Sequence, residues 1–321
     1  MMARPHLQKL VERARLLPAL PVGVVFPVDR DSLQLALSGA FAGYLAPTLI
    51  GPEERIRDAA NRAGLDISRL SLIDTPDEPR AASERAVALA RDGIVQALLR
   101  GSLAQEDLLG PIAAPDNGLR GPRRLSHATF LDIPGQARFL LLADASLNVA
   151  PNLAAKKDIV QNTIELAYAL GVVAPNVALL AAKSAVAPAF PSTSEAAALR
   201  SMAAQGAFAG AVVDGPLTPD VALSPDAARA AGMKSDVAGR ADILIAPTME
   251  AAAMVARTLT GLTGGLAAGL VLGAKVPVIM PSPRDPMDVR IASCVLASLV
   301  SGAAASLREA APADSGARVA A

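Results

Sequence analysis

Tryptophan is missing from this chain of 321 residues, and aromatic residues make up only 2% of it. The hydrophobic core must therefore consist of Ala, Val, Leu and Ile, which favours helices packed closely on a sheet over aromatic-lined pockets. The single cysteine, Cys294, lies in the apolar run IASCVLASLV. With no second cysteine, a disulfide and a thiolate metal site are excluded, so we interpret Cys294 as a small hydrophobic residue.

An excess of charge of either sign is also missing. The chain has 30 basic and 30 acidic residues, and its formal net charge is zero. Nucleic-acid-binding domains carry a basic excess or a basic stripe. The basic runs RPHLQKLVERAR and GLRGPRRL contain no interleaved aromatic residues, so we interpret them as solvated faces and predict no nucleic-acid partner.

Targeting and membrane-spanning segments are not apparent in the sequence. The N-terminus reaches charged residues at once and has no continuous apolar region of the kind found in signal peptides. The uncharged stretch Thr258–Ala274 contains five glycines and is shorter than a spanning helix. We therefore predict a cytoplasmic protein with no membrane partner.

Short apolar runs, many of them bounded by Pro or Gly, alternate with segments of helical periodicity. This alternation predicts βαβ units and a mostly parallel sheet. Residues 115–135 interrupt the pattern, because they are rich in turn formers. Eight or nine predicted strands with this interruption indicate two α/β domains separated by a cleft. The strand-like runs are residues 21–28, 46–51, 70–75, 94–101, 139–145, 176–182, 210–216, 242–247 and 276–282.

The motif SPRDPMD follows the last of these runs. A Ser282 hydroxyl and an Arg284 guanidinium beyond the carboxyl end of a strand can hold a tetrahedral anion such as phosphate. Asp285 or Asp288 could act as a general base or cap the following helix. The alternative is a loop punctuated by proline, with Arg284 exposed, and the residues alone leave both interpretations open.

Three weaker candidates lie elsewhere in the chain. Lys234 and Ser235 suit a phosphate, but the P-loop pattern is absent. Asp214, at a predicted strand end, either faces a cleft or closes a turn. Ser126 and His127 lie in the turn-rich region, where a lone histidine is more often a bystander than an acid or base.

Two motif-based cofactor sites are not supported. The glycine-rich stretch 261–274 does not fit GxGxxG, and its glycines are explained either by close helix–strand packing or by contact with a cofactor. His127 has no metal-ligand spacing around it, so we predict no metal site.

The order of the motifs is more specific than any one of them. In sequence they are RGSLAQEDLL, GLRGPRRLSHATF, LLADASLNVAPNL, KKDIVQNTIELAYALGVVAPNVALLAA, FPSTSEAAALRSM, GAVVDGPLTPDVAL, GMKSDVAGRADILIAPTMEAA and GLVLGAKVPVIMPSPRD. From about residue 20 to 300 the chain resembles the phosphate acetyltransferase/phosphate butyryltransferase family.

The resemblance implies two α/β domains like those of isocitrate and isopropylmalate dehydrogenases, with the active site in the interdomain cleft. The expected first domain is residues 1–142 plus about 286–321, and the expected second domain is residues 143–285. The family is usually dimeric, so a homodimer is expected.

The implied reaction is acyl-CoA plus phosphate giving acyl phosphate plus CoA, with acetyl or butyryl as the expected acyl group. Coenzyme A is then a substrate, and no tightly bound cofactor or metal is expected. A thiol of pKa about 8.5 is mostly protonated at neutral pH, so a positioned base assists its attack on acyl phosphate. The implied catalytic residues are Ser282, Arg284 and Asp288, and the implied substrate-binding residues are Lys234, Ser235, Ser126 and Asp214.

The chain departs from the family pattern in three places. Its arginine comes one position late, in Ser282-Pro283-Arg284; Ala252-Ala253 replaces Gly-Asn; and Ser184 replaces a glutamate. These changes indicate either an altered acyl specificity or a weakened activity. A CoA- or acyl-phosphate-binding module without turnover, and an acyltransferase with another acceptor, therefore remain as alternatives.

Overall fold

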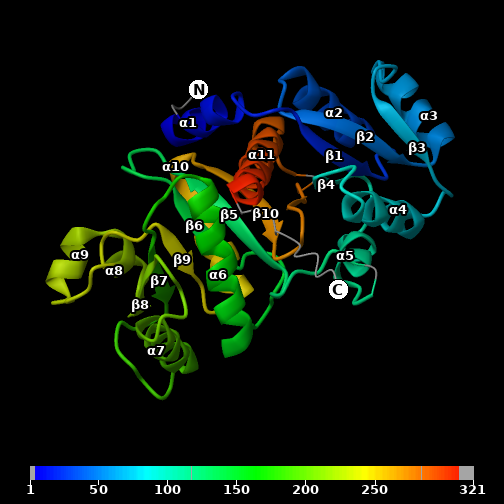
Figure 1. The fold of residues 1–321 in the computed structure, drawn as a ribbon. Helices are drawn as coiled ribbons and strands as arrows, with labels where there is room; N and C mark the ends of the chain where they lie inside the picture. The colour runs from blue at the N-terminus through cyan, green and yellow to red at the C-terminus, as the bar shows by residue number, and fades with distance from the viewer. Residues whose placement is uncertain (1–3, 117, 283, 311–321) are drawn as a thin grey trace, which may run out of the picture.

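Eleven strands join into one sheet in the computed structural model, which describes residues 4–116, 118–282 and 284–310. The strand order is β3-β2-β1-β4-β11-β10-β5-β6-β9-β7-β8 (Figure 1). The strands are β1 (Leu20–Val25), β2 (Leu45–Gly51), β3 (Ser71–Asp74), β4 (Ala97–Arg100), β5 (Ser126–Asp132), β6 (Leu140–Ala143), β7 (Asn176–Leu180), β8 (Val212–Leu217), β9 (Ile243–Ile245), β10 (Leu266–Leu272) and β11 (Val278–Ile279).

Helices connect most of the strands, as the alternating sequence pattern predicted. Several have local start and stop signals: Asp29 caps α2, Thr248 caps α10, and α3 ends at Gly64 in the left-handed conformation that favours glycine. The helices are α1 (Pro5–Ala14), α2 (Arg30–Phe41), α3 (Glu53–Ala63), α4 (Pro79–Arg91), α5 (Gln105–Ala113), α6 (Leu153–Ala169), α7 (Pro191–Ala204), α8 (Pro219–Leu223), α9 (Pro225–Ala230), α10 (Met249–Thr263) and α11 (Met287–Ala310).

The sheet consists of two parallel sets of strands that run in opposite directions. β3, β2, β1, β4 and β11 are parallel to one another, and so are β6, β9, β7 and β8. Between the sets, β11–β10, β10–β5 and β5–β6 are antiparallel pairs. Three reversals leave the sets antiparallel, so their carboxyl ends point to opposite edges of the sheet.

The two strands at this junction, β5 and β10, are the ones that the sequence pattern did not predict. β5 lies inside the turn-rich segment 115–135, and β10 lies in the glycine-rich stretch. Glycine is depleted in strands because it contributes no side chain to packing. The expected mostly parallel α/β sheet is thus confirmed, but with eleven strands and an antiparallel centre.

The two faces of the sheet are covered differently. On one face, a single cluster of buried apolar residues joins α1, α2, α3, α6, α7 and α11 to the strands. On the other face there are two clusters, one under α4 and α5 and the other under α8, α9 and α10. We call these the continuous face and the divided face; α6 and α11 lie in front of the sheet in Figure 1, on the continuous face.

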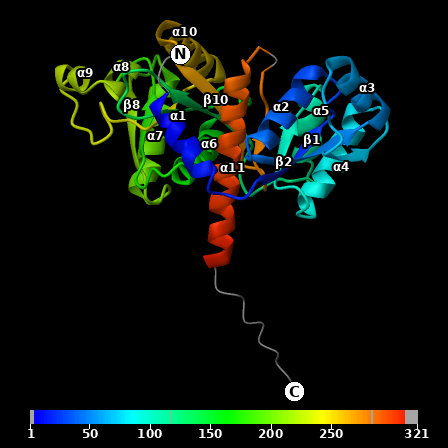
Figure 2. The same ribbon diagram turned by 90° about the horizontal axis from the view of Figure 1, so that it is seen from above.

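Helix α11 runs between the two parallel sets (Figure 2) and contacts α1, α2, α6, β10 and β11. Its segment Met287–Ser306 is long and apolar enough to cross a membrane by length and composition alone, but 56% of that window is buried inside the protein. This is the pattern of a core helix, and we interpret α11 as one.

Candidate active site

Three neighbouring parallel strands, β1, β4 and β11, end at the same edge of the sheet. Beyond these ends the chain forms a cavity of about 290 Å³. Its polar lining includes Asp29 and Asp31 after β1, Arg100 at the end of β4, Ser282 after β11, and Arg290 of α11. Ligands of open α/β sheets bind beyond the carboxyl ends of strands, so this cavity is the candidate site.

Arg100 provides a half-buried cation in this cavity. Its Nη2 donates to the carbonyl oxygen of Pro281 at 2.7 Å. Burial lowers the pKa of Arg100, while the carboxylates of Asp285 and Glu106 act to raise it, and a guanidinium stays charged in proteins. Among the described residues, no carboxylate forms a salt bridge with Arg100, so its charge is available to an anion.

The loop that carries Ser282 is held by its own hydrogen bonds. Ser282 donates its backbone N–H to Oδ2 of Asp285 at 2.8 Å, and its Oγ accepts the backbone N–H of Arg284 at 3.2 Å. Arg290 donates from Nε to the carbonyl oxygen of Asp285 at 2.8 Å and from Nη2 to Asp31 at 3.0 Å. The Arg284 side chain is exposed, and Pro283 lies outside the described residues.

Asp29 borders the cavity as the cap of α2, accepting the backbone N–H of Ser32 at 2.7 Å and the hydroxyl of Ser102. Burial raises the pKa of Asp29, but the hydrogen bonds from Ser102 and Ser32 outweigh it, so the pKa lies below its usual value. Asp29 is therefore ionised and held in place by these bonds.

Asp288, which the sequence favoured as the base, forms an exposed ion pair with Arg4 in the first turn of α11. Asp285, the other candidate, contacts the Ser282 loop directly. The base role of Asp288 stays a prediction, and Asp285 is the carboxylate that the structure brings beside Ser282.

The remaining predicted residues contact other parts of the fold. Lys234 is exposed in the loop between α9 and β9, and Ser235 accepts the backbone N–H groups of Val237 and Ala238. Asp214, in the edge strand β8, accepts the N–H of Gly215 at 2.7 Å and forms a 3.5 Å ion pair with Arg200.

Ser126 and His127 are neighbours in β5, and their side chains point to opposite faces of the sheet. Ser126 is fully buried on the continuous face, where its Oγ accepts Nδ2 of Asn162 of α6 at 2.9 Å. His127 is half-buried on the divided face. Substrate binding by Ser126 stays a prediction, although its hydroxyl already has a protein partner.

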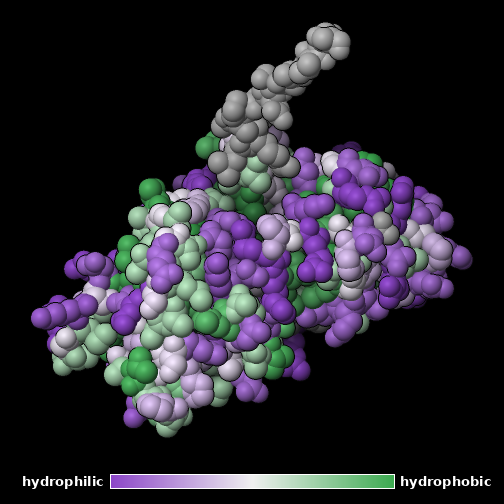
Figure 3. All heavy atoms as spheres, turned by 60° about the horizontal axis from the view of Figure 1, so that its bottom comes forward, coloured by the Kyte–Doolittle hydropathy of each residue, from purple (hydrophilic) through white to green (hydrophobic). Residues whose placement is uncertain are grey.

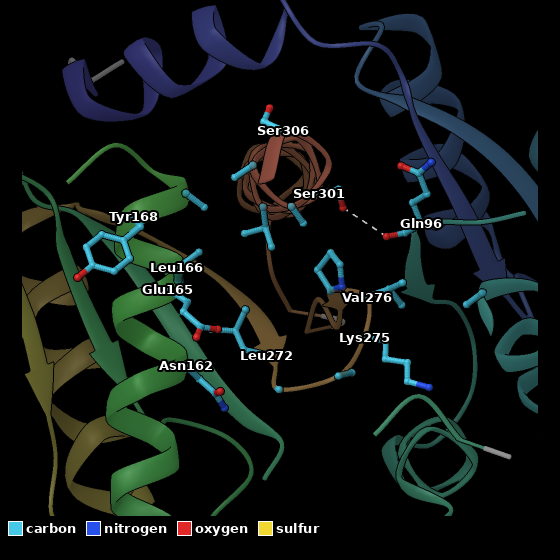
Figure 4. A pocket seen from close by; sticks show the side chains of 18 of the residues that line it. Gln96, Asn162, Glu165, Leu166, Tyr168, Leu272, Lys275, Val276, Ser301 and Ser306 are labelled. Carbon is cyan, nitrogen blue, oxygen red and sulfur yellow. Dashed lines mark hydrogen bonds between the residues drawn. The ribbon is translucent and has the colours of Figure 1, made fainter. Parts of the chain in front are cut away.

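A larger cavity of about 690 Å³ lies on the continuous face beside α11 and α6. On the side of the molecule that Figure 3 brings forward, hydrophilic residues interrupt the apolar surface. Figure 4 shows the side chains that line the cavity. Its polar groups are mostly engaged: Ser301 donates to the Gln96 carbonyl, and Asn162 donates to Ser126. None of the seven predicted site residues lines it, whereas Ser282 lines the smaller cavity, which therefore stays the candidate site.

A bound metal or a cysteine nucleophile finds no support here. Within the part of the chain that the structure describes, no three His, Cys, Asp or Glu side chains gather as metal ligands would. Cys294 is buried in α11, and burial raises its pKa to about 12. Such a thiol is not a nucleophile at neutral pH, in agreement with the interpretation from sequence.

Arg100 is the site residue that sequence reasoning missed. Its signal was present, because the run IVQALLRG places an arginine at the end of an apolar strand pattern and before a glycine. Gly101 lets the chain pass close to β1: a Cβ at this position would lie 2.5 Å from the carbonyl oxygen of Val25. A charged residue that ends a buried run is thus a marker for a group at the sheet edge.

Together, the fold and the cavity define a mixed α/β protein with a half-buried arginine in a cavity beyond the ends of parallel strands. The family described as "Phosphate acetyl/butaryl transferase" matches residues 78–297. The chain is 44% identical to the phosphate acetyltransferase of Rhizobium meliloti, over 91% of this chain and 92% of that protein. It is 32% identical to the phosphate butyryltransferase of Clostridium acetobutylicum, over 88% of this chain and 93% of that protein.

Among solved structures, a branched-chain phosphotransacylase from Enterococcus faecalis V583 superposes with a TM-score of 0.78 at 26% identity, covering 88% of this chain and 99% of that one. The chain therefore belongs to the phosphate acetyl/butyryl transferase family, which confirms the resemblance found in the sequence.

Proposed function

We propose that this protein is an acyltransferase that exchanges a short acyl group between CoA and inorganic phosphate. The relatives named phosphate acetyltransferase and phosphate butyryltransferase, each matched over most of its length, support this reaction. Acetyl-CoA and butyryl-CoA are the expected substrates, and acyl phosphate and CoA are the products.

The observation that carries the proposal at the level of residues is the cavity between Arg100 and Ser282. Phosphate would accept hydrogen bonds from the Arg100 guanidinium and the Ser282 hydroxyl, and the cation would offset its charge. The exposed Arg284, in the same loop, is proposed as a second cation for phosphate. Asp285 or Asp288 would handle the proton of the CoA thiol.

The proposed chemistry is direct attack. An oxygen of hydrogen phosphate forms a bond to the thioester carbon, the C–S bond breaks, and the proton that phosphate loses ends on the sulfur of CoA. Negative charge develops on the acyl oxygen during this step, and nearby cations and N–H donors stabilise it.

A direct assay tests the function. CoA release from acetyl-, propionyl- and butyryl-CoA is measured with and without phosphate, and we expect phosphate-dependent release from at least one of them. Arg284→Ala should lower kcat/KM at least about tenfold, a loss of about 1.4 kcal/mol, if Arg284 holds phosphate. A protein that binds CoA and gains thermal stability without any turnover would instead be the catalytically weakened binding module.

The substitutions that motivated that alternative have structural explanations in part. Ala252 is fully buried in the apolar cluster under α10, and Ser184 contacts Thr218, whose N–H it accepts at 3.0 Å. Burial of Ala252 favours a packing role, and this supports the active enzyme over the binding module.

We propose further that the chain is organised as two α/β domains, residues 1–142 plus about 286–321 and residues 143–285, with a cleft like that of isocitrate and isopropylmalate dehydrogenases. The two apolar clusters on the divided face support a division into two units. The clusters place β11 with the first unit and β6 with the second, across the bounds taken from the family resemblance. A cytoplasmic homodimer without nucleic-acid or membrane partners, and substrate contacts by Lys234, Ser235, Ser126 and Asp214, complete the proposal.

A further inference from the structure

A polar strip lies between the two apolar clusters of the divided face. We define it as His127 and Thr129 of β5 together with Gly269 of β10, which pairs with Thr129. His127 and Thr129 alternate with Ala128, which packs on the continuous face, so their side chains point the other way. The three residues belong to neither cluster, and the strip is the polar centre of this face.

Arg100 points to the same face as the strip. It alternates in β4 with Leu99, which packs on the continuous face, and follows Leu98 of the α4/α5 cluster by two residues. In register, His127 pairs with Val271, Val271 with Val278, and Val278 with Leu98. The side chains of Arg100 and His127 are therefore on one face of the sheet.

The imidazole of His127 packs against Gly269. A Cβ on Gly269 would lie 2.5 Å from Nε2 and 2.6 Å from Cε1 of His127. Any side chain at position 269 would displace the ring, so this glycine provides the space for the imidazole. The close approach of His127 also explains a glycine in the middle of a buried strand.

Two carboxylates act on the imidazole from different elements. Asp144, just after β6, accepts backbone N–H groups of His127 at 3.1 Å and of Ser146 and Leu147 at 2.9 Å, and the side-chain amide of Asn148 at 2.6 Å. Asp285, in the Ser282 loop, interacts electrostatically with both His127 and Arg100. His127 thus lies within electrostatic reach of a fixed carboxylate and of the proposed phosphate loop.

The protonation of the ring follows from its surroundings. Nδ1 is buried and, in the described part of the chain, has no hydrogen-bond partner. A proton on Nδ1 would be a buried, unsatisfied donor, so we assign the proton to Nε2. Burial lowers the pKa of His127 more strongly than Asp144 and Asp285 raise it, so the imidazole is neutral at neutral pH.

We propose that His127 is a catalytic residue whose Nε2–H donates a hydrogen bond to the acyl carbonyl oxygen of acyl-CoA. This rests on the proposed acyl transfer to phosphate. As the phosphate oxygen bonds to the carbonyl carbon, the carbon–oxygen π pair moves onto the acyl oxygen; when that pair re-forms the double bond, the C–S bond breaks and the proton of hydrogen phosphate ends on sulfur. A donor held in place stabilises the oxygen most when it is anionic, so its effect is on kcat.

The test compares His127→Leu with His127→Gln, whose amide N–H lies near the position of Nε2. We expect kcat for phosphate-dependent CoA release to fall about 100-fold in the Leu variant, with the KM for phosphate within about twofold, and to recover in the Gln variant to within about tenfold of the unsubstituted protein. Thermal unfolding confirms that each variant is folded. If the Leu variant does not fold, His127→Asn, which lacks a donor at the Nε2 position, replaces it and should show the same loss.

The outcomes separate this inference from the function on which it rests. A Leu or Asn variant with full kcat overturns the role of His127 alone. Equal losses in the Gln and Leu variants also overturn it, because a glutamine keeps the donor but is no proton acceptor at neutral pH. An unsubstituted protein that releases no CoA with phosphate from any acyl-CoA overturns the proposed function and, with it, the donor role.

Discussion

The two parallel sets of strands differ in what lies beyond their carboxyl ends. After β1, β4 and β11, charged groups surround a cavity and one of them, Arg100, has no carboxylate in a salt bridge with it among the described residues. In the set β6, β9, β7 and β8, two ion pairs lie within the protein: Lys156 of α6 with Glu195 of α7, and Arg200 with Asp214. The first set thus has a half-buried arginine that an anion could pair with, whereas the two ion pairs of the second set are already made within the protein.

The largest effect should come from removing the available cation. Arg100→Ala should lower kcat/KM by at least about 100-fold, a loss of about 2.7 kcal/mol of transition-state stabilisation, because phosphate then lacks its half-buried cation. The matched control is Arg138→Ala in the second set, which breaks an exposed 3.0 Å pair with Asp242 and should change kcat/KM by less than about twofold. Steady-state kinetics of CoA release at varied phosphate measures kcat/KM of both variants. Similar losses in the two variants would show that the two sets of strands do not differ in their contribution to activity.

Removing an ion pair of the second set should lower the stability of the fold and leave the activity nearly unchanged. Glu195→Ala leaves Lys156, whose side chain is only 6% exposed, without its carboxylate, and we expect a loss of about 3 kcal/mol in the free energy of unfolding. Glu195→Gln keeps an acceptor for the Lys156 ammonium and should lose less. Urea unfolding measures the stability, and kcat/KM of the folded protein should stay within about threefold. An unchanged unfolding midpoint would show that this pair is not structural.

A smaller effect is expected at Asp29, which borders the cavity but acts as a helix cap. Asp29→Ala should cost about 1 kcal/mol of stability at pH 7, as the loss of an N-cap does. Because the folded-state pKa lies below the ordinary value of 3.8, the ionised carboxylate stabilises the fold above that pH, and this contribution is lost as the pH falls through the lowered pKa.

The pH dependence of Asp29 is checked by urea unfolding of the unsubstituted and Ala proteins between pH 7 and about pH 3. The stability difference should shrink toward the acid end. Asp29→Asn is the matched control, since it keeps the cap and removes the ionisation. A difference that stays constant with pH would assign the effect to the cap alone.

The smallest effect is expected at Asp214. Its carboxylate accepts the N–H of Gly215 within β8 and forms a 3.5 Å pair with the exposed Arg200, so Asp214→Ala should change stability by less than about 1 kcal/mol and kcat/KM by less than about twofold. A large loss of activity at unchanged stability would favour the other interpretation of the sequence, in which Asp214 faces substrate, and would give the second set a catalytic role.

Local patterns were sufficient for most of the fold and for part of the site. The parallel strands were predictable because each is an apolar run bounded by Pro or Gly, and Ser282 was predictable because it follows such a run. β10 was not, because its mid-strand Gly269 serves a contact with His127 of another strand. Arg100 was overlooked because its neighbours in the cavity, Asp31 and Arg290, come from distant parts of the chain.

The sequence by itself determined the α/β class and the family, since both are read from the order and period of local motifs. The tertiary structure alone decided which strand ends lie together, because three antiparallel steps in the centre of the sheet reverse one set against the other. It also separated Ser126 from His127, which are adjacent in sequence, because a strand points successive side chains to opposite faces. The contact with Asn162 of α6 shows that Ser126 is buried on the continuous face, and His127 points to the divided face.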